Sequence, residues 1–319
     1  PQAIKEDMIN LLKHVNSNAL FLSPIFNRSY YTDEYITFSE SDQLLAKISA
    51  NAFHFDDNEI AQGIVPNPDV VNTRNRKILS DKSIQAGEGV FVVNKDKFKD
   101  CSDEEKKYIK PLFEPYQMAR YYIEPENEKV ILYITKSNWK NDAPTLLNHL
   151  AKYKEIMERR RENENGRISF MHLHWPREAR YFEEGGKILA VRKCVLNPIF
   201  LYTEREAYVM MAVNVIMTNR WDLKFLTGLL NSKLVKFWLR YKGKMQGENY
   251  QLDKEPLQKI PLPNPIVSQH EIANLVSRII DAKQNNKDYD SSVIEQEINM
   301  LVYHIYGLEP EEIAVIEAS

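Results

Sequence analysis

The stretch KFWLRYKGKMQGENYQLDKEPLQKIPLP, residues 236–263, joins three kinds of sequence in one run. It opens with the end of an apolar helix, continues through a basic loop that carries glycines and amide side chains, and leaves through an extended segment spaced by prolines. Upstream, Asp222 is a suitable N-cap for this helix, and Gly243 is a suitable stop. The pattern predicts one long helix that leads into a loop with more cations and amides than a turn requires.

Before Asn219 the sequence favours strands. Short runs rich in Val, Ile, Tyr and Phe recur between Ile60 and Thr218; they are GVFVVN, KVILYIT, KILAVRK, PIFLYT and AYVMMAVNVIM. One helix is expected to interrupt them, with Pro144 in its first turn. The apolar face of that helix consists of Leu147, Leu150, Tyr153 and Met157.

After Asn219 apolar residues recur at helical spacing. The pairs Ser268/Glu271 and Ser292/Glu295 have the spacing of capping boxes, which predicts a helix start at each place. We therefore expect an α+β fold, in which a mixed β-sheet region precedes a helical C-terminal region. The expected divisions are a lead-in or linker over residues 1–45, a β-rich recognition region over residues 46–219 and a helical supporting region over residues 220–319.

The charge of the chain is unevenly distributed. A net charge of -3 over 319 residues argues, taken alone, against a nucleic-acid binder. Residues 220–254 hold eight Lys and Arg against three Asp and Glu, and residues 139–194 hold twelve against eight, whereas residues 268–319 hold three against ten. A basic middle followed by an acidic tail can still present one cationic face to a polyanion.

The composition also bounds the compartment. Cys101 and Cys194 do not make a disulfide framework, so a reducing cytoplasm is expected. No apolar run approaches the roughly 20 residues that cross a bilayer, so no membrane partner is expected.

Common catalytic and phosphate-binding motifs are absent from the sequence. It has no GxxxxGK[ST], GxGxxG or GxSxG. His172 and His174 stand two residues apart, but no CxxC or HExxH accompanies them, so polar or DNA-facing histidines are expected rather than a zinc site. We therefore expect neither a catalytic residue nor a metal site in this chain.

Several stretches along residues 44–317 resemble sequence blocks of one family. They are IAQGIVPNPDVVN, GVFVVNKD, KPLFEPYQMARYYI, LAKYKEIMERRREN, HWPREARYFEEGGKILAVRK, LTGLLNSKLVKFWLR with YQLDKEPLQKIPLP, and EQEINMLVYHIYGLEPEEIAVIE. They are similar to successive blocks that follow the methyltransferase domain in the TaqI-like and Eco57I-like adenine methyltransferases. One block alone would be weak, but this many in the right order make the resemblance specific.

The resemblance implies a target recognition domain, the DNA-reading part of a type IIG restriction-modification enzyme or of an N6-adenine methyltransferase. The family's catalytic [ND]PP[YF] motif and its S-adenosylmethionine glycine motif are absent here, and VPNPD at residues 65–69 has one proline displaced and no aromatic residue. We therefore expect no cofactor in this chain. S-adenosylmethionine, and Mg²⁺ where a nuclease is attached, are expected only in the catalytic portion of the parent.

The basic stretch at residues 242–251 has the side chains that a DNA reader needs, cations for phosphates and amides for base edges. Paired amide donors and acceptors suit adenine in particular. The candidate contacts are Lys242, Lys244, Gln246, Asn249 and Gln251. The alternative is a solvated loop in which Tyr250 and Leu252 only fill the core.

Two further groups of candidates lie upstream. The sequence VVNTRNRK is expected to be a loop, and its candidates are Asn72, Arg74, Arg76 and Lys77. A soluble, flexible hairpin tip is the alternative. The sequence HLHWPREARYF is expected to be extended, with His172 and His174 on one face, and its candidates are His172, His174, Arg177 and Arg180. Trp175 is expected to be a core anchor, and Arg192 and Lys193 are expected to meet phosphate at a sheet edge.

The sequence therefore predicts a sequence-specific double-stranded DNA-binding module that works with a methyltransferase catalytic domain or subunit. The parent is expected to methylate adenine N6, with or without an attached endonuclease. A protein-interaction or specificity subunit is the alternative from another class; it would dock a separate methyltransferase and have little DNA affinity of its own. The net charge of -3 favours that alternative.

Overall fold

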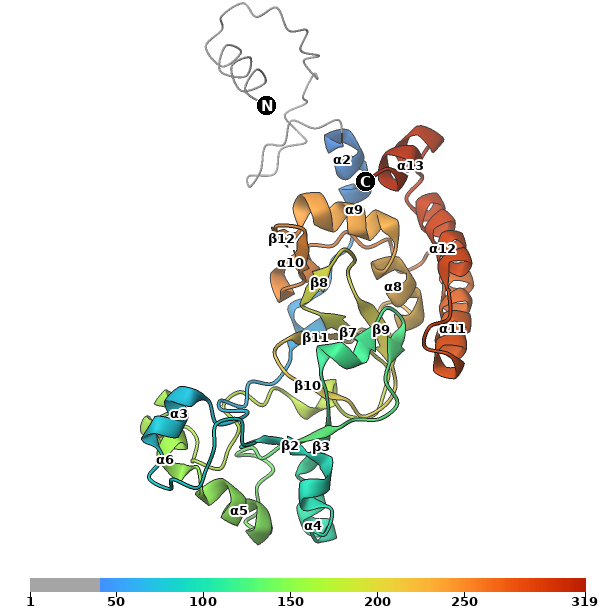
Figure 1. The fold of residues 1–319 in the computed structure, drawn as a ribbon. Helices are drawn as coiled ribbons and strands as arrows, with labels where there is room; N and C mark the ends of the chain where they lie inside the picture. The colour runs from blue at the N-terminus through green and yellow to red at the C-terminus, as the bar shows by residue number, and fades with distance from the viewer. Residues whose placement is uncertain (1–40) are drawn as a thin grey trace, which may run out of the picture. The chain divides into compact units, whose positions relative to one another are not determined.

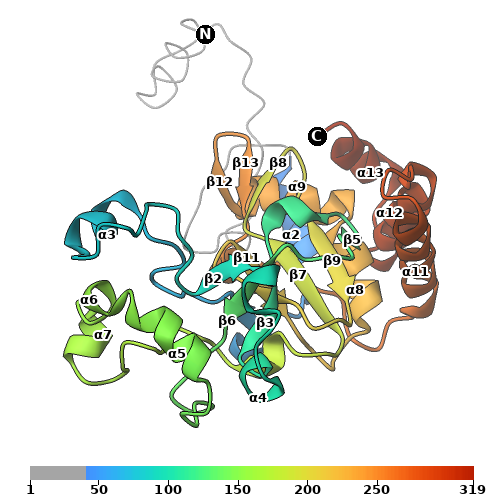
Figure 2. The same cartoon turned by 60° about the horizontal axis from the view of Figure 1, so that its bottom comes forward.

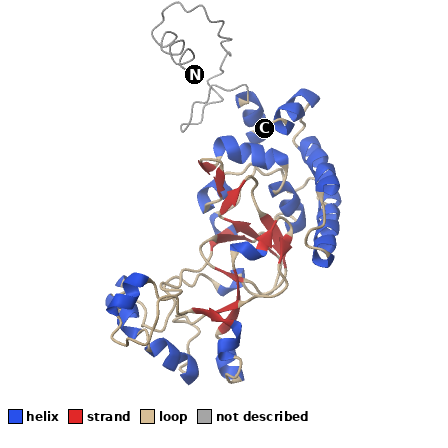
Figure 3. Ribbon diagram, in the orientation of Figure 1, coloured by secondary structure: helices blue, strands red, loops and turns tan. Residues whose placement is uncertain are grey.

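The computed structural model describes residues 41–319, which fall into two compact units, Pro1–Ala50 and Asn51–Ser319. The described part of the first unit holds helix α2 (Asp42–Ser49). Most of the predicted lead-in over residues 1–45 therefore lies outside the described residues. The second unit carries the other described elements, which are drawn in Figures 1 and 3.

The elements of the second unit are as follows. The strands are β1 (Ile60–Gln62), β2 (Val92–Asn94), β3 (Ile109–Phe113), β4 (Met118–Ala119), β5 (Tyr122–Ile123), β6 (Lys129–Leu132), β7 (Lys187–Val191), β8 (Lys193–Val195), β9 (Phe200–Thr203), β10 (Tyr208–Val209), β11 (Val213–Ile216), β12 (Lys244–Gln246) and β13 (Asn249–Gln251). The α-helices are α3 (Thr73–Ile78), α4 (Asp103–Lys106), α5 (Pro144–Ala151), α6 (Lys154–Met157), α7 (Arg161–Glu164), α8 (Leu223–Leu230), α9 (Lys233–Lys242), α10 (Lys254–Gln258), α11 (His270–Asn285), α12 (Ser292–Ile305) and α13 (Pro310–Glu317). Short 3-10 helices are η2 (Asp57–Glu59), η3 (Lys95–Phe98), η4 (Pro115–Gln117) and η5 (Ala179–Tyr181). None of the helices in residues 41–319 is long and apolar enough to cross a membrane.

The strands form four sheets. Their orders are β1-β11-β7-β9, β10-β3-β6-β2, β12-β13-β8 and β4-β5. Strand β10 pairs with β3 in parallel, whereas the other pairs of named strands are antiparallel. Mixed sheets followed by C-terminal helices confirm the predicted α+β class, and each of the five predicted β-type runs contains a strand. The division between residues 46–219 and 220–319 stays a prediction.

Helix α8 joins the first sheet to the C-terminal helices. It contacts β7 and β9 on one side and α11 and α12 on the other (Figure 1). Phe225 and Leu229 on this helix are fully buried. A Cβ on Gly228 would lie 2.6 Å from the Ile272 side chain and 2.9 Å from that of Val276, so this contact requires glycine.

The predicted long helix after Asp222 is in fact two helices, α8 and α9. Asp222 caps α8 as predicted, but the chain breaks at Asn231. The Asn231 side-chain amide donates to the Phe200 carbonyl at 2.8 Å and accepts from the Phe200 N–H at 3.2 Å. Ser232 then starts α9 by accepting from the Val235 N–H. A tertiary bond to strand β9 therefore divides a run that is helical by its local pattern.

Other helix boundaries also differ from the prediction. Pro144 opens a helix as predicted, but Met157 lies in the separate helix α6. Helix α11 follows Gln269, whose side chain does not cap the helix. The Gln269 amide oxygen instead accepts from the Asp222 N–H at the start of α8. Helix α12 follows Ser291, whose hydroxyl donates to Glu295 at 2.6 Å. Both predicted capping boxes are therefore wrong, but the predicted helix starts are confirmed to within two residues, at His270 and at Ser292.

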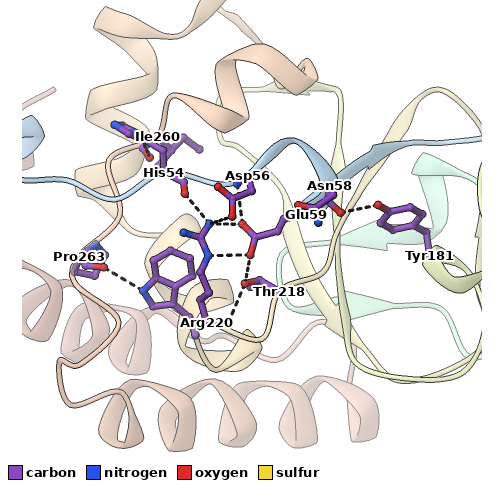
Figure 4. Close-up of polar contacts among 10 residues, drawn as sticks. His54, Asp56, Asn58, Glu59, Tyr181, Thr218, Arg220, Ile260 and Pro263 are labelled. Carbon is purple, nitrogen blue, oxygen red and sulfur yellow. Dashed lines mark hydrogen bonds and ion pairs between the residues drawn. The ribbon is translucent and has the colours of Figure 1, made fainter.

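An ion-pair cluster ties the start of this unit to its later segments (Figure 4). The Glu59 carboxylate pairs with Arg220, and Arg220 also donates to the His54 carbonyl at 2.7 Å. Beside it, the Trp221 indole N–H donates to the Pro263 carbonyl at 3.1 Å. Burial raises the pKa of Glu59, but its hydrogen bonds, led by that from Arg220, outweigh burial and leave the pKa below its usual range.

Candidate functional site

The basic stretch that the sequence predicts to be a loop is a β-hairpin. Strand β12 pairs with β13, and β13 pairs in turn with β8, so the segment completes a three-stranded antiparallel sheet (Figure 2). Gly247 has a φ of +61° at the turn, a conformation that glycine adopts without strain. The loop prediction fails because the ladder partner β8 is distant in the sequence.

One face of this sheet gathers the polar candidates of the basic stretch. Opposed residues in antiparallel strands share a face, and so do residues two apart in one strand. The register therefore places two rows on one side, Lys244–Gln251–Lys193 and Gln246–Asn249–Val195. We call these six residues the hairpin face. Gln251 is half-buried and the other five are exposed.

The opposite face of the same sheet is apolar and anchors it. Met245, Tyr250 and Cys194 lie side by side there, and Tyr250 is buried. Leu252, just beyond β13, is buried as well, so the alternative in which Tyr250 and Leu252 fill the core is confirmed for these two side chains. Both cysteines are free and buried, and burial raises the pKa of the Cys194 thiol to about 11. This anchoring fixes which face of the hairpin points to solvent.

Asp253 holds the base of the hairpin. Its carboxylate accepts from Lys244 Nζ at 2.7 Å and from the Arg192 guanidinium at 2.5 and 3.1 Å. Burial raises the pKa of Asp253, but the hydrogen bonds from Lys244 and Arg192 outweigh it and lower the pKa overall. Arg192 also donates to the Met211 carbonyl at 2.7 Å. Arg192, predicted to meet a phosphate, is thus engaged inside the protein.

Other groups of the basic stretch and its neighbour β8 stay available. Lys193 is exposed and Lys242 is half-buried, and neither side chain has a hydrogen bond or ion pair with any residue in 41–319. The Gln251 amide donates to the Gln246 side-chain oxygen at 2.7 Å, which orients the Gln246 amide. Within the described part of the chain, the NH₂ group of Gln246 and the side-chain amide of Asn249 have no partner and can bind a ligand.

The second group of candidates lies on helix α3 rather than in a loop. Asn72 is its N-cap, and its side chain accepts from the Asn75 N–H at 2.8 Å. Arg76 donates to a backbone carbonyl in the following loop at 2.8 Å. Arg74 and Lys77 are exposed and have no partner within the described part of the chain. Helix α3 packs beside α6 and stands apart from the hairpin in both views (Figures 1 and 2).

The third group lies in an irregular segment, so the predicted shared strand face is wrong. His172 is buried, and its Nδ1 accepts from the Ser169 N–H at 3.1 Å. His174 is half-buried, with Nδ1 at 3.2 Å from the Glu162 carboxylate. Burial lowers the pKa of both imidazoles and, for His174, outweighs the opposing effect of Glu162. No group of three His, Cys, Asp or Glu that could hold a metal occurs in residues 41–319.

Trp175 is 50% exposed, so its prediction as a core anchor is wrong. Its indole stacks on the His174 ring, with centroids 5.2 Å apart and planes at 29°. The Arg177 guanidinium carbon lies 5.4 Å from the indole centroid. Arg180 instead forms an exposed ion pair with Glu178 at 2.9 Å. The free aromatic surface in this segment therefore belongs to Trp175.

Arg160, the residue before helix α7, holds this segment in place. Its side chain is buried, and its guanidinium donates to backbone carbonyls rather than to a carboxylate. The accepting carbonyls are those of Asn67, Met157, Ser169, Phe170 and His172. Burial lowers the pKa of Arg160 to about 10, so it stays charged at neutral pH. The sequence of the run Arg159–Arg161 shows three adjacent cations, but it does not predict which of their side chains is buried.

Backbone hydrogen bonds connect the hairpin with the Trp175 segment. The Leu252 N–H donates to the Arg192 carbonyl, and the Arg192 N–H donates to the Ala212 carbonyl. The neighbouring residue, Met211, donates its N–H to the Ile64 carbonyl, and Val65 exchanges two hydrogen bonds with Trp175. All of these bonds are 2.8–3.1 Å long. The structure therefore joins the first and third groups of candidates in one framework, while α3 stands apart.

Residues 110–262 match the TaqI-like C-terminal specificity domain. This segment belongs to that family. The fold is similar to that of the type IIL restriction-modification enzyme MmeI, solved in complex with DNA, with a TM-score of 0.55 and 13% identity over 84% of this chain and 34% of that chain. The type IIG restriction endonuclease BpuSI gives a TM-score of 0.41 and 12% identity over 85% of this chain and 33% of that chain. Among curated proteins, none matches in sequence.

The specificity domain contains both joined groups of candidates, the hairpin and the Trp175 segment. Helix α3 precedes it, and helices α11–α13 follow it. The likeness to MmeI establishes the fold, and the chain spans about a third of the length of that enzyme.

Proposed function

We propose that this chain is a sequence-specific double-stranded DNA-binding module, the target recognition part of a restriction-modification enzyme that methylates adenine N6. The hairpin face carries this proposal, because it combines the free cation Lys193 with the available amides of Gln246 and Asn249 on an exposed antiparallel sheet. Membership of residues 110–262 in a specificity-domain family supports it, as does a fold shared with a DNA-bound restriction-modification enzyme.

The hairpin is a two-stranded antiparallel ribbon, a form that the major groove of B-DNA admits. Gln246 and Asn249 flank the turn at its tip, where an amide can make the paired contact to adenine N6 and N7. Lys193 and Lys242 lie farther from the tip, where phosphates would flank an inserted ribbon. In this arrangement the amides select the sequence and the lysines supply affinity that falls as salt rises.

The catalytic step is assigned to another portion of the parent. The sequence lacks the adenine methyltransferase motif, and the chain spans about a third of the length of MmeI. That portion would bind S-adenosylmethionine, and Mg²⁺ where a nuclease is attached, and would dock against this chain in the cytoplasm. The recognition module would hold the site while the catalytic domain takes the adenine out of the duplex.

A protein-interaction role remains the second candidate. The helical C-terminal region is acidic, and Val293 and Met300 expose 70% and 53% of their surfaces beside a groove between α11 and α12. In that role the chain would dock a separate methyltransferase and have little affinity for DNA.

The first experiment is to titrate the chain with a pool of short random-sequence duplexes at low and moderate salt, and to sequence the retained DNA. We expect a short adenine-containing motif to be enriched. The logarithm of the binding constant should fall with the logarithm of salt concentration by about 0.9 per phosphate neutralised. Absence of DNA binding at low salt would contradict the proposed function and favour the protein-interaction role.

Two variants with matched controls connect the result to the hairpin face. Gln246→Ala should weaken binding to the enriched motif by about 1–3 kcal/mol and relax selectivity at one position. Lys193→Ala should weaken binding to all sequences and reduce the salt slope by about 1. Gln296→Ala and Arg278→Ala, which change exposed residues on α12 and α11, should bind as the unchanged protein does.

A further inference from the structure

Trp175 differs from the other tryptophans of the chain. Trp221 and Trp238 are buried, and Trp139 is half-buried against Tyr108, with ring centroids 5.2 Å apart. Trp175 alone among the four exposes half of its surface. Large aromatic side chains are rarely left in water without a partner, and indoles are enriched where they bind one.

The exposed indole is held in a fixed position. The backbones of Trp175 and Val65 exchange two hydrogen bonds, at 3.0 and 2.9 Å. His174 stacks against the ring, and beneath that stack Arg160 fixes the preceding turn through the His172 carbonyl at 2.7 Å. A side chain that is already ordered loses little conformational entropy on binding, so its contact area converts efficiently into affinity.

Arg177 places a cation beside the Trp175 indole, while the nearby Glu162 carboxylate lies 3.2 Å from His174. Arg177 lies 5.4 Å from the indole centroid, and its guanidinium donates only to uncharged groups, the Gln62 side chain at 3.2 Å and the Gly63 carbonyl at 3.4 Å. No carboxylate in residues 41–319 pairs with it. Met211, also 50% exposed, lies on the framework that continues to the hairpin. An aromatic surface beside an unpaired cation complements a nucleobase attached to a phosphate backbone.

We propose that Trp175 stacks on a nucleobase that has left the helical stack of bound DNA. The faces of bases inside a B-form duplex are covered by their neighbours, so the indole can take a base only where the duplex is opened or kinked. Arg177 then faces the phosphate of the displaced nucleotide. This inference rests on the proposed DNA-binding function and adds a contact to a distorted duplex to the major-groove contacts of the hairpin face.

The test compares Trp175→Phe with Trp175→Leu in binding to the enriched duplex and to single-stranded poly(dT), whose bases are free of a duplex stack. Phenylalanine keeps an aromatic face, whereas leucine keeps apolar bulk and loses the face. We expect Trp175→Leu to weaken binding to both DNAs by about 5- to 150-fold. Trp175→Phe should keep most of the affinity. The salt slope should stay unchanged in both variants, because stacking displaces no counterion.

Poly(dT) should also quench the tryptophan fluorescence of the unchanged protein and not that of Trp175→Phe, since the other three tryptophans are less exposed. Tyr116→Ala, which removes another exposed aromatic residue, is the control and should bind normally.

Three outcomes would overturn the inference. Equal binding by the unchanged protein and by Trp175→Leu would rule out the stacking contact, while the proposed DNA-binding function would still stand. A reduced salt slope in Trp175→Leu would mean that the indole acts only by supporting a cation. Failure of the unchanged protein to bind any DNA at low salt would overturn the proposed function together with this inference.

Discussion

At the scale of single residues, buried polar groups decide how the candidate site is held. Arg160 shows this most clearly, because its guanidinium donates to five backbone carbonyls and to no carboxylate among residues 41–319. Such a residue acts as a multidentate clamp on irregular backbone, which has no ladder of its own to satisfy its carbonyls. The neighbouring Arg161 is exposed and has no partner within the described residues, so the pair offers a matched comparison.

Arg160→Met should therefore destabilise the protein by about 3 kcal/mol or more, because it leaves several carbonyls without a donor. The loss should appear as a lower free energy of unfolding in denaturant titrations. The stability of Arg160→Lys, which has three donors in place of five, should lie between that of the unchanged protein and that of Arg160→Met. Arg161→Met should change the stability by less than about 0.5 kcal/mol. Equal effects at the two positions would contradict the clamp.

His149 makes a second prediction, for pH. Its ring Nε2 lies 2.9 Å from the Val90 carbonyl, and burial lowers the pKa of this imidazole to about 4. In the unfolded chain the imidazole takes up a proton near pH 6.5, whereas in the folded state it stays neutral. Its contribution to stability is therefore complete above about pH 6.5 and is lost as the pH falls towards about 4, by about 3 kcal/mol in all.

The measurement is the free energy of unfolding at several pH values between 4 and 7. His149→Gln keeps an amide donor for the Val90 carbonyl and does not titrate. The variant should therefore lose less stability on acidification than the unchanged protein does. Parallel pH profiles for the two proteins would show that His149 is not held neutral.

At the scale of elements, the hairpin is the feature on which the proposed reading of DNA depends. Its two-residue turn places Gly247 at a φ of +61°, and a Cβ there would meet nothing within 4 Å. Any cost of a substitution therefore comes from backbone conformation alone and not from a clash.

Gly247→Val should cost about 1–2 kcal/mol, since a β-branched residue is strained in the left-handed region. Gly247→Asn should cost less, because asparagine tolerates this conformation in hairpin turns. Thermal unfolding reports the stability, and binding to the enriched duplex reports the geometry of the hairpin face. We expect the valine variant to lose affinity and the asparagine variant to keep most of it. The opposite ranking would show that the turn does not set the position of the face.

At the scale of the whole molecule, contacts within the second unit cross the predicted division at residue 219. Strand β13 pairs with β8, and the Asn214 side chain donates to the Leu252 carbonyl at 2.5 Å. Phe53 and Leu262 exchange two backbone hydrogen bonds of 2.8 Å. These links bind early and late segments of one chain, so the β-rich and helical regions should unfold together.

Calorimetry on the chain should accordingly show residues 51–319 unfolding in a single cooperative transition. A chain that ends at Asn219 should lack that transition, because it loses the helix that covers β7 and β9 and the strand that completes the sheet with β8. Two separable transitions, with the β-rich region folding alone, would contradict this expectation and favour the division at residue 219.

Local pattern is enough to predict the parts of this fold that depend on neighbours in the sequence. The β-branched runs locate strands because alternation and propensity are local properties, and Asp222 identifies a helix start because a cap bonds to its own first turn. The family blocks identify the specificity domain for the same reason, since they are contiguous stretches. The polar side chains that β12 and β13 contribute to the hairpin face are likewise a cluster in the sequence, whereas Lys193 joins them only through the pairing of β8 with β13.

What only the tertiary structure decided depends on partners that are far apart in the chain. The basic stretch becomes a hairpin because β8 supplies a ladder, and its helix is divided because Asn231 bonds to strand β9. Trp175 is exposed and Arg160 is buried, which is the reverse of what residue type suggests. Burial and hydrogen-bond satisfaction are properties of the packed chain, so the identity of a side chain limits them without determining them.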